Sequence, residues 1–539
     1  MKKGVAASIL TVVLALLALA YGDARAAATP EGTIVIGLPS LGPEDWLVPA
    51  RAQSGATAVV PVFNTLLERD DKTGKPAPGL AAKWEQSKDG KAWTFDLRKG
   101  VQFHDGWGEL TAEDVKFSYQ VALRDDSTSD MKGIFTNFVK DVEVVNPYRV
   151  VFHMKSPSWE ILYKFLETPP FFQIVSKKYF DKVGWQQAGK HPIGTGPYRF
   201  AEHKLGEYVR LEAVENYWGG VPYAKTLIIR GIPEEATRVA MLQTGALHLA
   251  PISYESMAKV RAAGLKIIRF ERMMQMVGTL QGQYLPDREG YDPKVPWALP
   301  DREKALKVRR ALSLAINRQE IVNQILQGMG SVEGCTAIQC FPGMAGHDPA
   351  LKVDPYDPEG AKKLLAEGGY PDPSKITITV DSTPHAARPL NGPVAQAMAM
   401  YWRNIGITVK EQTSDYTTLT EKMIKRRLAG VMWVYPTPAF DEPIMQLYTV
   451  SYSKGRVLQF AEYPELDTLI EKTMAELDAE KRADLQKEMG RWMYNNMVAI
   501  PVCYADMPWG ASPKFEWQHL PGQVTVGYIH NAEKMRLSK

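Results

Sequence analysis

The residue types and spacings that support catalysis are sparse in this chain. Its nine histidines are scattered, and none is paired at the spacing of a metal site. The sequence contains no HExxH helix, no GxSxG turn and no aspartate-rich calcium loop. His104 begins a tight turn, where we expect its ring to hydrogen-bond the backbone. We therefore predict no catalytic residue, no metal, no cofactor and no enzymatic activity.

Three cysteines are the remaining reactive groups. Cys335 and Cys340 lie in a short stretch flanked by glycine and proline, and we expect a small loop disulfide between them in an oxidising compartment. Cys503 lies in an apolar run and is expected to be a buried small hydrophobe. The cysteines form neither a CxxC motif nor a Cys/His metal spacing.

Groups that could bind a ligand follow several predicted strands. His385 and Arg388 come after an apolar run at 376–380, and ligand contacts in α/β sheets gather outside the carboxyl ends of strands. An arginine there could clamp a carboxylate or a phosphate with two parallel bonds. An ordinary surface pair is an equally open interpretation. Trp46 and Tyr416 also follow predicted strands and are candidates by loop position alone.

A second candidate segment lies around residues 431–441. Trp433 and Tyr435 would offer flat apolar area to a ligand, or they pack in the core instead. Side chains alternate along a strand, so both residues lie on one face, and either both line a cleft or neither does. The long loop at 284–302 contains Trp297 and could edge the cleft or contact a membrane partner.

The elements that must position these groups alternate between helix and strand. Asp357 followed by Pro358 predicts a helix start, and Gly368 with Gly369 predicts its end. The predicted elements that follow are a strand at 376–380, a helix at 394–405, a strand at 407–409, a helix at 417–427 and a strand at 431–434. This alternation predicts a parallel sheet with helices on its faces.

Several stretches elsewhere have distinctive sequences. They are WTFDLRKGVQFHDG from Trp93, LTAEDVKFS from Leu110, PIGTGPY from Pro192, NYWGG from Asn216, VRRALSLAINR from Val308, LLAEGGYP from Leu364 and IGI from Ile405. They resemble the motifs of the extracellular solute-binding proteins of peptide, nickel and related ABC importers. The resemblance follows the family's order and covers nearly the whole chain after its first 28 residues. The glycines suit tight turns, Thr111 suits a helix cap, and Trp93 and Phe95 suit packing. The motifs therefore identify scaffold rather than a cargo site.

The resemblance implies an α/β architecture. This is the two-lobed periplasmic binding protein fold of type II, with an extra subdomain and a ligand cleft between the lobes. The implied division is a signal peptide at 1–28, lobe I from 29–65, 194–300 and 506–539, an extra subdomain at 66–193 on the lobe I side, and lobe II at 301–505.

The resemblance also bears on the cargo. In peptide-binding members an acidic residue after the strand at 431–434 pairs with the α-ammonium of the peptide. This chain has Thr437 at the expected acidic place, so either Asp441 takes that role or the cargo lacks a free ammonium. We expect an importer component that delivers a peptide-like or other polar organic solute to a membrane permease. A nickel or metal chelate, a sugar or an opine are alternative cargoes, and a receptor or chaperone-like binder without an importer is an alternative role.

The first residues have the form of a secretory signal peptide. Lys2 and Lys3 precede an apolar run from Val5 to Ala20 and a stretch of small residues that ends at Ala28. The run is shorter than the roughly 20 residues that span a bilayer, and no cysteine follows for a lipid anchor. We therefore expect a cleaved, periplasmic monomer that is not a lipoprotein. A net charge of only +3 over 539 residues, with no basic tract, argues against nucleic acid as a partner.

Overall fold

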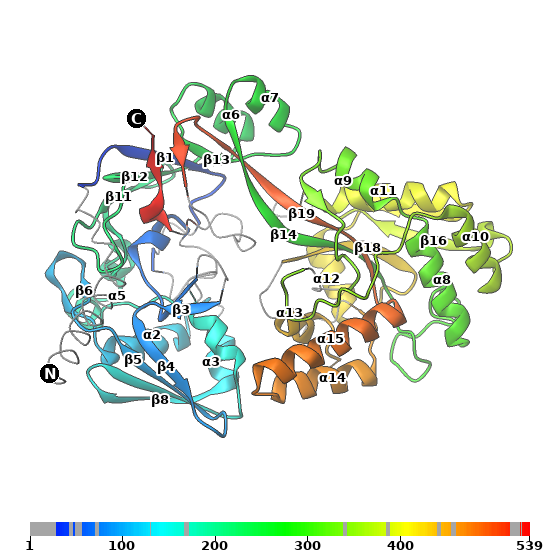
Figure 1. The fold of residues 1–539 in the computed structure, drawn as a ribbon, viewed down its shortest axis with the longest axis horizontal. Coiled ribbons are helices and arrows are strands. Elements are labelled where there is room, and N and C mark those ends of the chain that lie inside the picture. Colours follow the sequence, from blue (N-terminus) through cyan, green and yellow to red (C-terminus); the bar gives the residue numbers. More distant parts are fainter. Residues whose placement is uncertain are drawn as a thin grey trace, which may run out of the picture.

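Two α/β lobes share one long β-sheet (Figure 1). The computed structural model describes residues 29–42, 47–48, 57–70, 75–129, 131–166, 172–337, 342–383, 389–438, 443–453, 460–517, 529 and 531–538. We call lobe I the part built on β1 and β10 to β13, and lobe II the part built on β16 to β18. These lobes confirm the predicted two-lobed α/β architecture.

Within the described part of the chain, the shared sheet has eleven strands. Their order is β10, β11, β12, β1, β13, β19, β14, β18, β16 and β17, and β15 pairs with β19 outside this path. The strands are β1 Thr33–Leu38, β10 Tyr198–Lys204, β11 Tyr208–Ala213, β12 Thr226–Gly231, β13 Leu249–Pro251, β14 Lys266–Leu280, β15 Gly330–Ser331, β16 Thr377–Asp381, β17 Thr408–Gln412, β18 Val431–Pro438 and β19 Ile500–Ala511.

Two long antiparallel strands, β14 and β19, run from one lobe into the other (Figure 1). On the lobe I side β19 also pairs with β13, and on the lobe II side β14 also pairs with β18. Each crossing strand is therefore a member of both lobes. A bend in this two-stranded ribbon would change the angle between the lobes.

The alternation predicted in the C-terminal half is confirmed. β16 lies parallel to both β17 and β18, and α11 packs against all three strands. Ile378 and Val380 of β16 and Met432 of β18 are buried, whereas the residues of the edge strand β17 are exposed or half-buried. The helices are α2 Ala112–Leu123, α3 Met131–Phe138, α4 Lys177–Val183, α5 Trp185–Lys190, α6 Glu235–Gln243, α7 Met257–Ala262, α8 Arg302–Leu314, α9 Arg318–Gln324, α10 Pro358–Glu367, α11 Asn391–Asn404, α12 Tyr416–Ile424, α13 Pro443–Val450, α14 Pro464–Ala475 and α15 Ala479–Asn496.

A separate four-stranded antiparallel sheet lies beside lobe I. Its order is β4, β5, β9 and β8, and in β5 the side chains of Trp93, Phe95 and Leu97 are buried while their neighbours are half-buried, as the alternation predicted. The Asp114 carboxylate accepts hydrogen bonds from the Thr111 N–H and hydroxyl at the start of α2, at 2.9 and 3.1 Å. The shorter strands are β2 Leu67–Arg69, β3 Pro76–Pro78, β4 Ala81–Gln86, β5 Ala92–Leu97, β6 Gln102–Phe103, β7 Gly108–Glu109, β8 Val139–Asn146, β9 Arg149–Met154, β20 Phe515–Glu516 and β21 Arg536–Leu537.

The predicted start of α10 is also confirmed and gives a testable expectation. Asp357 Oδ1 accepts the N–H of Gly360 at 2.8 Å, which satisfies a donor that the helix itself leaves open. Asp357→Ala should therefore lower the free energy of unfolding by about 1 kcal/mol in chemical denaturation. Asp357→Asn keeps an acceptor oxygen and should cost less than the alanine. Equal losses in the two variants would contradict the cap.

The role of the 284–302 loop as a cleft edge or a partner contact stays a prediction, but its tryptophan does not face outward. Trp297 is fully buried, and its Nε1 donates to the Gln281 carbonyl at 3.1 Å. The Trp297 carbonyl in turn accepts from Arg309 of α8 at 2.7 Å. Trp297 therefore anchors the loop inside lobe II and presents no ring to a partner.

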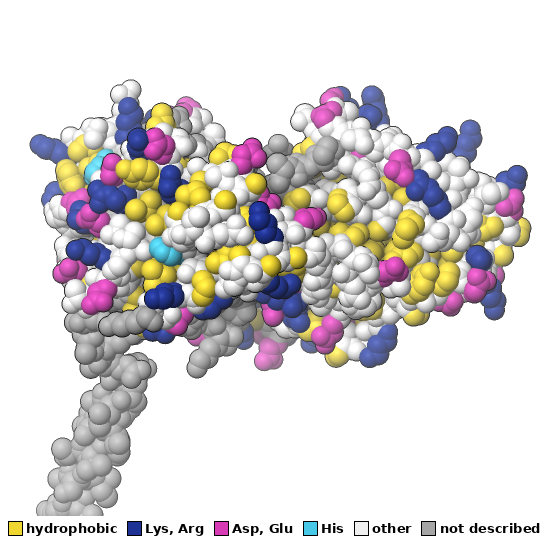
Figure 2. All heavy atoms as spheres, turned by 90° about the horizontal axis from the view of Figure 1, so that it is seen from above, with side chains coloured by type: hydrophobic (Ala, Val, Ile, Leu, Met, Phe, Trp, Pro, Cys, Tyr) yellow, Lys and Arg dark blue, Asp and Glu magenta, His cyan; other side chains and the backbone are white. Residues whose placement is uncertain are grey.

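The surface agrees with the nearly balanced charge. On the face shown in Figure 2, basic and acidic side chains are interspersed over both lobes rather than gathered into a field of one sign. Within the described part of the chain, no helix has the length and apolarity needed to cross a membrane.

Candidate functional site

The carboxyl ends of β16 and β17 are joined by one buried carboxylate. Asp381, the last residue of β16, is 2% exposed. It accepts hydrogen bonds from the Thr383 hydroxyl at 2.6 Å, the Gln412 amide at 2.8 Å, and the Ser414 hydroxyl and N–H at 2.6 and 3.2 Å. A buried charge is tolerated when hydrogen bonds saturate it. Asp381 therefore ties the two strand ends together and fixes where the loops beyond them begin.

Sequence reasoning missed Asp381, although a usable signal was present. The residue directly follows the apolar run Ile376–Val380, at the position where parallel strands of an α/β sheet present polar groups. Because Asp381 is already bonded to neutral donors of its own chain, its carboxylate holds the ends of β16 and β17 together.

Trp433 and Tyr435 lie side by side on β18, as the alternation predicted. Their ring centroids are 5.6 Å apart, and the rings meet at 56°. Both residues are buried, and the Trp433 carbonyl accepts from the Thr279 hydroxyl of β14 at 3.0 Å. Among the described residues, Trp433 Nε1 has no hydrogen-bond partner. The pair is a buried aromatic contact, and whether it borders a cleft stays a prediction.

The other predicted site residues separate into two groups. Tyr416 is the first residue of α12, two positions after Ser414, so the Asp381 network holds its neighbourhood in place. The remaining candidates lie outside the described residues; they are Trp46, His385, Arg388 and Asp441. The structure therefore brings Trp433 and Tyr435 together and places the start of α12 beside the end of β16.

Three of the family-like motifs, those that begin at Trp93, Pro192 and Asn216, meet on the lobe I side. The His104 N–H donates to the Gly194 carbonyl, and His104 Nε2 lies 2.9 Å from the Gly196 carbonyl. A carbonyl oxygen only accepts, so Nε2 carries the proton and donates. The turn that begins at His104 is thus bound to the GTGPY segment at two points, and His104 is a structural residue, as predicted.

A third motif joins the same junction. Asn64 Oδ1 accepts from the Thr195 hydroxyl at 3.0 Å and from Trp218 Nε1 at 3.3 Å, and Asn64 Nδ2 donates to the Tyr217 hydroxyl at 2.8 Å. The backbone of η1 (Thr57–Val62) presses directly on the same segment, because the Gly196 N–H donates to the Val62 carbonyl at 2.9 Å. Hydrogen bonds therefore join these segments into one scaffold.

Burial around His104 has an electrostatic consequence. The side chain is 6% exposed, and this burial lowers the pKa of His104 from its ordinary value to about 4. The bond to Gly196 partly opposes that fall. At neutral pH the ring is therefore uncharged, and its role is the hydrogen bond to the Gly196 carbonyl.

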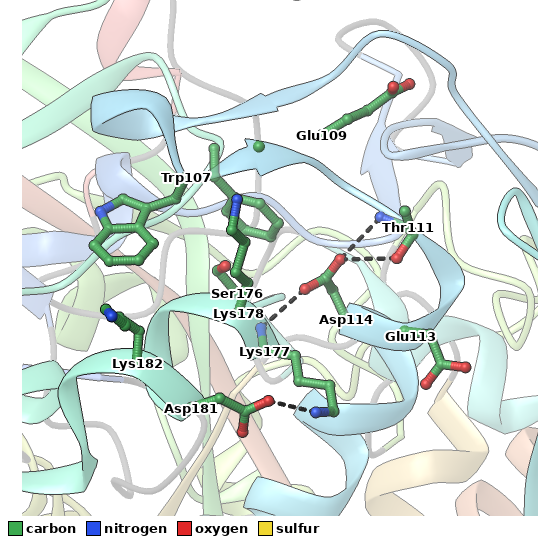
Figure 3. A pocket seen from close by; sticks show the side chains of 12 residues that line it. Trp107, Glu109, Thr111, Glu113, Asp114, Ser176, Lys177, Lys178, Asp181 and Lys182 are labelled. Atoms are coloured by element: carbon green, nitrogen blue, oxygen red, sulfur yellow. Dashed lines mark hydrogen bonds and ion pairs between the residues drawn. The ribbon is translucent and has the colours of Figure 1, made fainter.

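A hollow of about 670 Å³ lies between Trp107, the start of α2 and the face of α4. Figure 3 shows its centre, where Asp114 is bonded to Thr111 and to the N–H of Lys177. Lys177 Nζ pairs with Asp181 at 2.5 Å. These polar groups already form hydrogen bonds and an ion pair that stabilise the first turns of α2 and α4. We therefore assign the hollow to the packing between these helices. Two further hollows of lobe I, of about 560 and 440 Å³, lie beside the motif junction.

The cysteines show no reactive environment among the described residues. Cys335 and Cys503 are both buried, and burial raises the pKa of Cys335 to about 11 and that of Cys503 well above its ordinary value. A buried thiol with a raised pKa is a poor nucleophile. Cys503 is a buried small residue, as predicted. Cys340 lies outside the described residues, so its disulfide with Cys335 stays a prediction. Within the described ranges, no cluster of three metal-ligating side chains occurs.

Comparisons with known proteins place this geometry in context. A family model described as bacterial extracellular solute-binding proteins, family 5 Middle, matches residues 75–456. The dipeptide-binding protein of Escherichia coli is 28% identical, covering 86% of this chain and 88% of the relative. Heme-binding protein A of Haemophilus influenzae is 27% identical, with 82% of each chain covered. The solved ABC transporter substrate-binding protein CtaP of Listeria monocytogenes shares the fold, with a TM-score of 0.77 at 23% identity over 95% of this chain and all of that one.

Proposed function

The chain belongs to family 5 of the bacterial extracellular solute-binding proteins, and from this membership we propose that it captures a polar organic solute between its lobes and delivers it to the permease of an ABC importer. The observation that carries the proposal is the two-lobed sheet, in which β14 and β19 pair with each other, β19 also pairs with β13 of lobe I, and β14 also pairs with β18 of lobe II. Such a connection suits a hinge, and hinge closure around a ligand is the working motion of binding proteins with this architecture.

The lobe II strand ends support a cargo site on that side of the cleft. Asp381 anchors the loop that leads to His385 and Arg388, and β18 leads from the aromatic pair to Asp441. Trp433 and Tyr435 would supply apolar area, and the unpartnered indole N–H of Trp433 would suit an acceptor on the cargo. Flat apolar walls with a few polar groups are typical of sites for small organic ligands.

The nature of the cargo is the finer part of the proposal. The two relatives described above are named for different cargoes, a dipeptide and a haem, so family membership alone leaves the choice of cargo open. We favour a peptide-like or other polar organic solute, with chelates, sugars and opines as the competing classes. Thr437 is fully buried and uncharged, so the ammonium of a peptide would have to pair with another group, for which we propose Asp441.

Export completes the proposal. The signal-like segment at 1–28 would carry the chain across the membrane and be removed, leaving a protein that works in the periplasm. Native mass spectrometry of protein purified without denaturation tests capture directly. The expected result is a small molecule that is released on unfolding and that stabilises the emptied protein when added back. Absence of any retained or rebinding solute from cell extract would contradict capture.

Pairing of Asp441 with a peptide ammonium predicts a specific loss of binding affinity. If the cargo is a peptide, Asp441→Asn should weaken binding of free-amine dipeptides at least tenfold, which corresponds to about 1.4 kcal/mol. The physical reason is the loss of a charge-assisted hydrogen bond to the ammonium. The measurement is isothermal titration with a dipeptide and with its N-acetylated form. The wild type should prefer the free amine, and the variant should not.

The matched control is Asp484→Asn, which removes an exposed carboxylate on α15 that pairs with Lys487. It should bind like the wild type. If Asp441→Asn binds free-amine dipeptides as tightly as the wild type, Asp441 is not the ammonium partner, while the capture proposal remains open to the mass-spectrometric test.

A further inference from the structure

The ribbon that joins the lobes contains an irregular step at its centre. β14 pairs with β19 up to Phe270, opposite Met507, and resumes at Met274, opposite Ala505. Three residues of β14 therefore stand opposite the single residue Asp506. Within this bulge Arg272 has a φ of 53°, a left-handed conformation that is unfavourable for a side chain of its type.

Asp506 holds this bulge through its carboxylate. Oδ1 accepts the N–H of Arg272 at 2.7 Å, so the strained residue is bonded directly. Oδ2 forms an ion pair with the guanidinium of Arg269. This residue lies on β14, one position before the last paired residue ahead of the bulge. Asp506 is 1% exposed, and burial raises the pKa of its carboxyl, while the Arg272 N–H and Arg269 oppose that rise. Oδ1 is therefore hydrogen-bonded, and Oδ2 is ion-paired.

The backbone of Asp506 connects the same point to both lobes. The Tyr254 hydroxyl, which precedes α7 in lobe I, donates to the Asp506 carbonyl at 2.6 Å. The Asp506 N–H donates to the Met329 carbonyl, next to β15 on the lobe II side, at 3.1 Å. The bulge itself also reaches lobe II, because Arg272 Nη1 donates to the Pro342 carbonyl at 3.2 Å.

The bulge also adjoins the proposed cargo site. Met274, the first regular residue after the bulge, pairs with Pro438, the last residue of β18. One residue earlier on β18, Thr437 pairs with Gln275, and two residues before that, Tyr435 pairs with Val277. A change in the shape of the bulge would therefore shift the end of β18, from which the chain continues to Asp441.

We infer that Asp506 is a positioning residue for ligand capture, whose carboxylate holds the β14 bulge in one shape and thereby sets the angle between the lobes. A bulge strengthens local twist and bends the strand that carries it, so its shape determines the direction in which the ribbon leaves lobe I. Without the carboxylate, the Arg272 N–H loses its acceptor and the bulge can take several shapes. The two lobes then sample a wider range of angles. Closure of the lobes around a ligand would begin from several open conformations instead of one.

The inference is tested on the ligand-free protein, so its outcome is independent of which cargo is bound. Spin labels attached to non-canonical amino acids at Leu205 in lobe I and Met400 on α11 in lobe II report the distance between the lobes; both positions are exposed. Asp506→Ala should broaden the distance distribution from pulsed dipolar spectroscopy about twofold relative to the wild type. A distribution that superposes on that of the wild type would overturn the inference.

Two milder variants keep the test decisive if the alanine variant folds poorly. Asp506→Asn retains one acceptor for the Arg272 N–H but loses the charge, and Arg269→Gln loses only the ion pair at a residue with an exposed side chain. Both should broaden the distribution by less than the alanine. Narrow, wild-type distributions in both would overturn the role of the carboxylate in setting the angle.

The matched control is Asp114→Asn, which alters a carboxylate that is buried to a similar degree and that caps α2, away from the ribbon. It should lower the melting temperature and leave the distance distribution unchanged. If Asp114→Asn broadens the distribution as much as the Asp506 variants, the effect reports general loss of stability and the inference fails.

Discussion

Gly194→Ala is expected to lower the free energy of unfolding by about 3 kcal/mol, among the largest effects of any methyl addition in this chain. A Cβ at this position would lie 2.0 Å from the Val62 carbonyl oxygen and 2.8 Å from the Val62 carbonyl carbon. Both are backbone atoms, so no side-chain rotation relieves the overlap. The GTGPY segment or η1 must move, and either motion breaks the bond from Gly196 to Val62 and strains the bonds to His104. Chemical denaturation followed by tryptophan fluorescence measures the loss.

Gly133→Ala serves as the control for this prediction. Gly133 lies inside α3 and is exposed, and a Cβ there would have no atom within 4 Å. Alanine should raise stability by about 0.5–1 kcal/mol, since glycine is unfavourable within a helix. Equal stability changes for Gly194→Ala and Gly133→Ala would mean that the close approach of η1 to the glycine motif is not a structural constraint.

Acid should destabilise the protein through His104 by about 3 kcal/mol as the pH falls from 6.5 to 4. The unfolded chain takes up a proton near the ordinary pKa of 6.5, whereas the buried ring does so only near 4. Between these values the unfolded state binds more protons, so stability declines with falling pH, and below about pH 4 the loss stays constant. Above 6.5 both states carry a neutral ring, and this contribution to the pH dependence vanishes.

His104→Gln isolates this contribution. Glutamine can still donate from its side-chain amide to the Gly196 carbonyl, but it does not titrate. Burial also lowers the pKa of His248, which accepts the Val35 N–H at Nδ1, so the wild type has other acid-sensitive groups that the variant shares. The free energies of unfolding of the two proteins should therefore converge as the pH falls from 7 to 4. Parallel curves over this range would show that His104 is not the acid-sensitive group.

Much of the fold was predictable from local pattern. The alternation of Trp93, Phe95 and Leu97, the Asp357 cap and the order of elements from α10 to β18 all follow from side-chain period, capping and turn chemistry, which act within a few residues. Local pattern did not predict the burial of Trp297. Its indole N–H bonds the Gln281 carbonyl, and its own carbonyl accepts from Arg309 of α8.

The candidate site was predicted only in part. Strand alternation correctly placed Trp433 and Tyr435 on one face, because it depends on a single strand. Asp381 was missed, because its role depends on Gln412 and Ser414, which become neighbours only when β16 and β17 pair. Asp506 was missed for the same reason: an acid in an apolar strand is visible in the sequence, but the bulge it supports lies about 230 residues earlier in the chain.

The sequence by itself determined the family, the elements and the absence of recognisable catalytic motifs, because these depend on residue types at short and regular spacings. The tertiary structure decided what those residues do. In the fold, His104 hydrogen-bonds a second motif through its backbone and its ring. The Asp381 carboxylate accepts hydrogen bonds from neutral donors, and Asp506 lies at the junction of the lobes. Each of these roles depends on contacts between segments far apart in the chain, and hydrogen bonds of this kind form only where folding has already brought donor and acceptor together in a water-excluded interior.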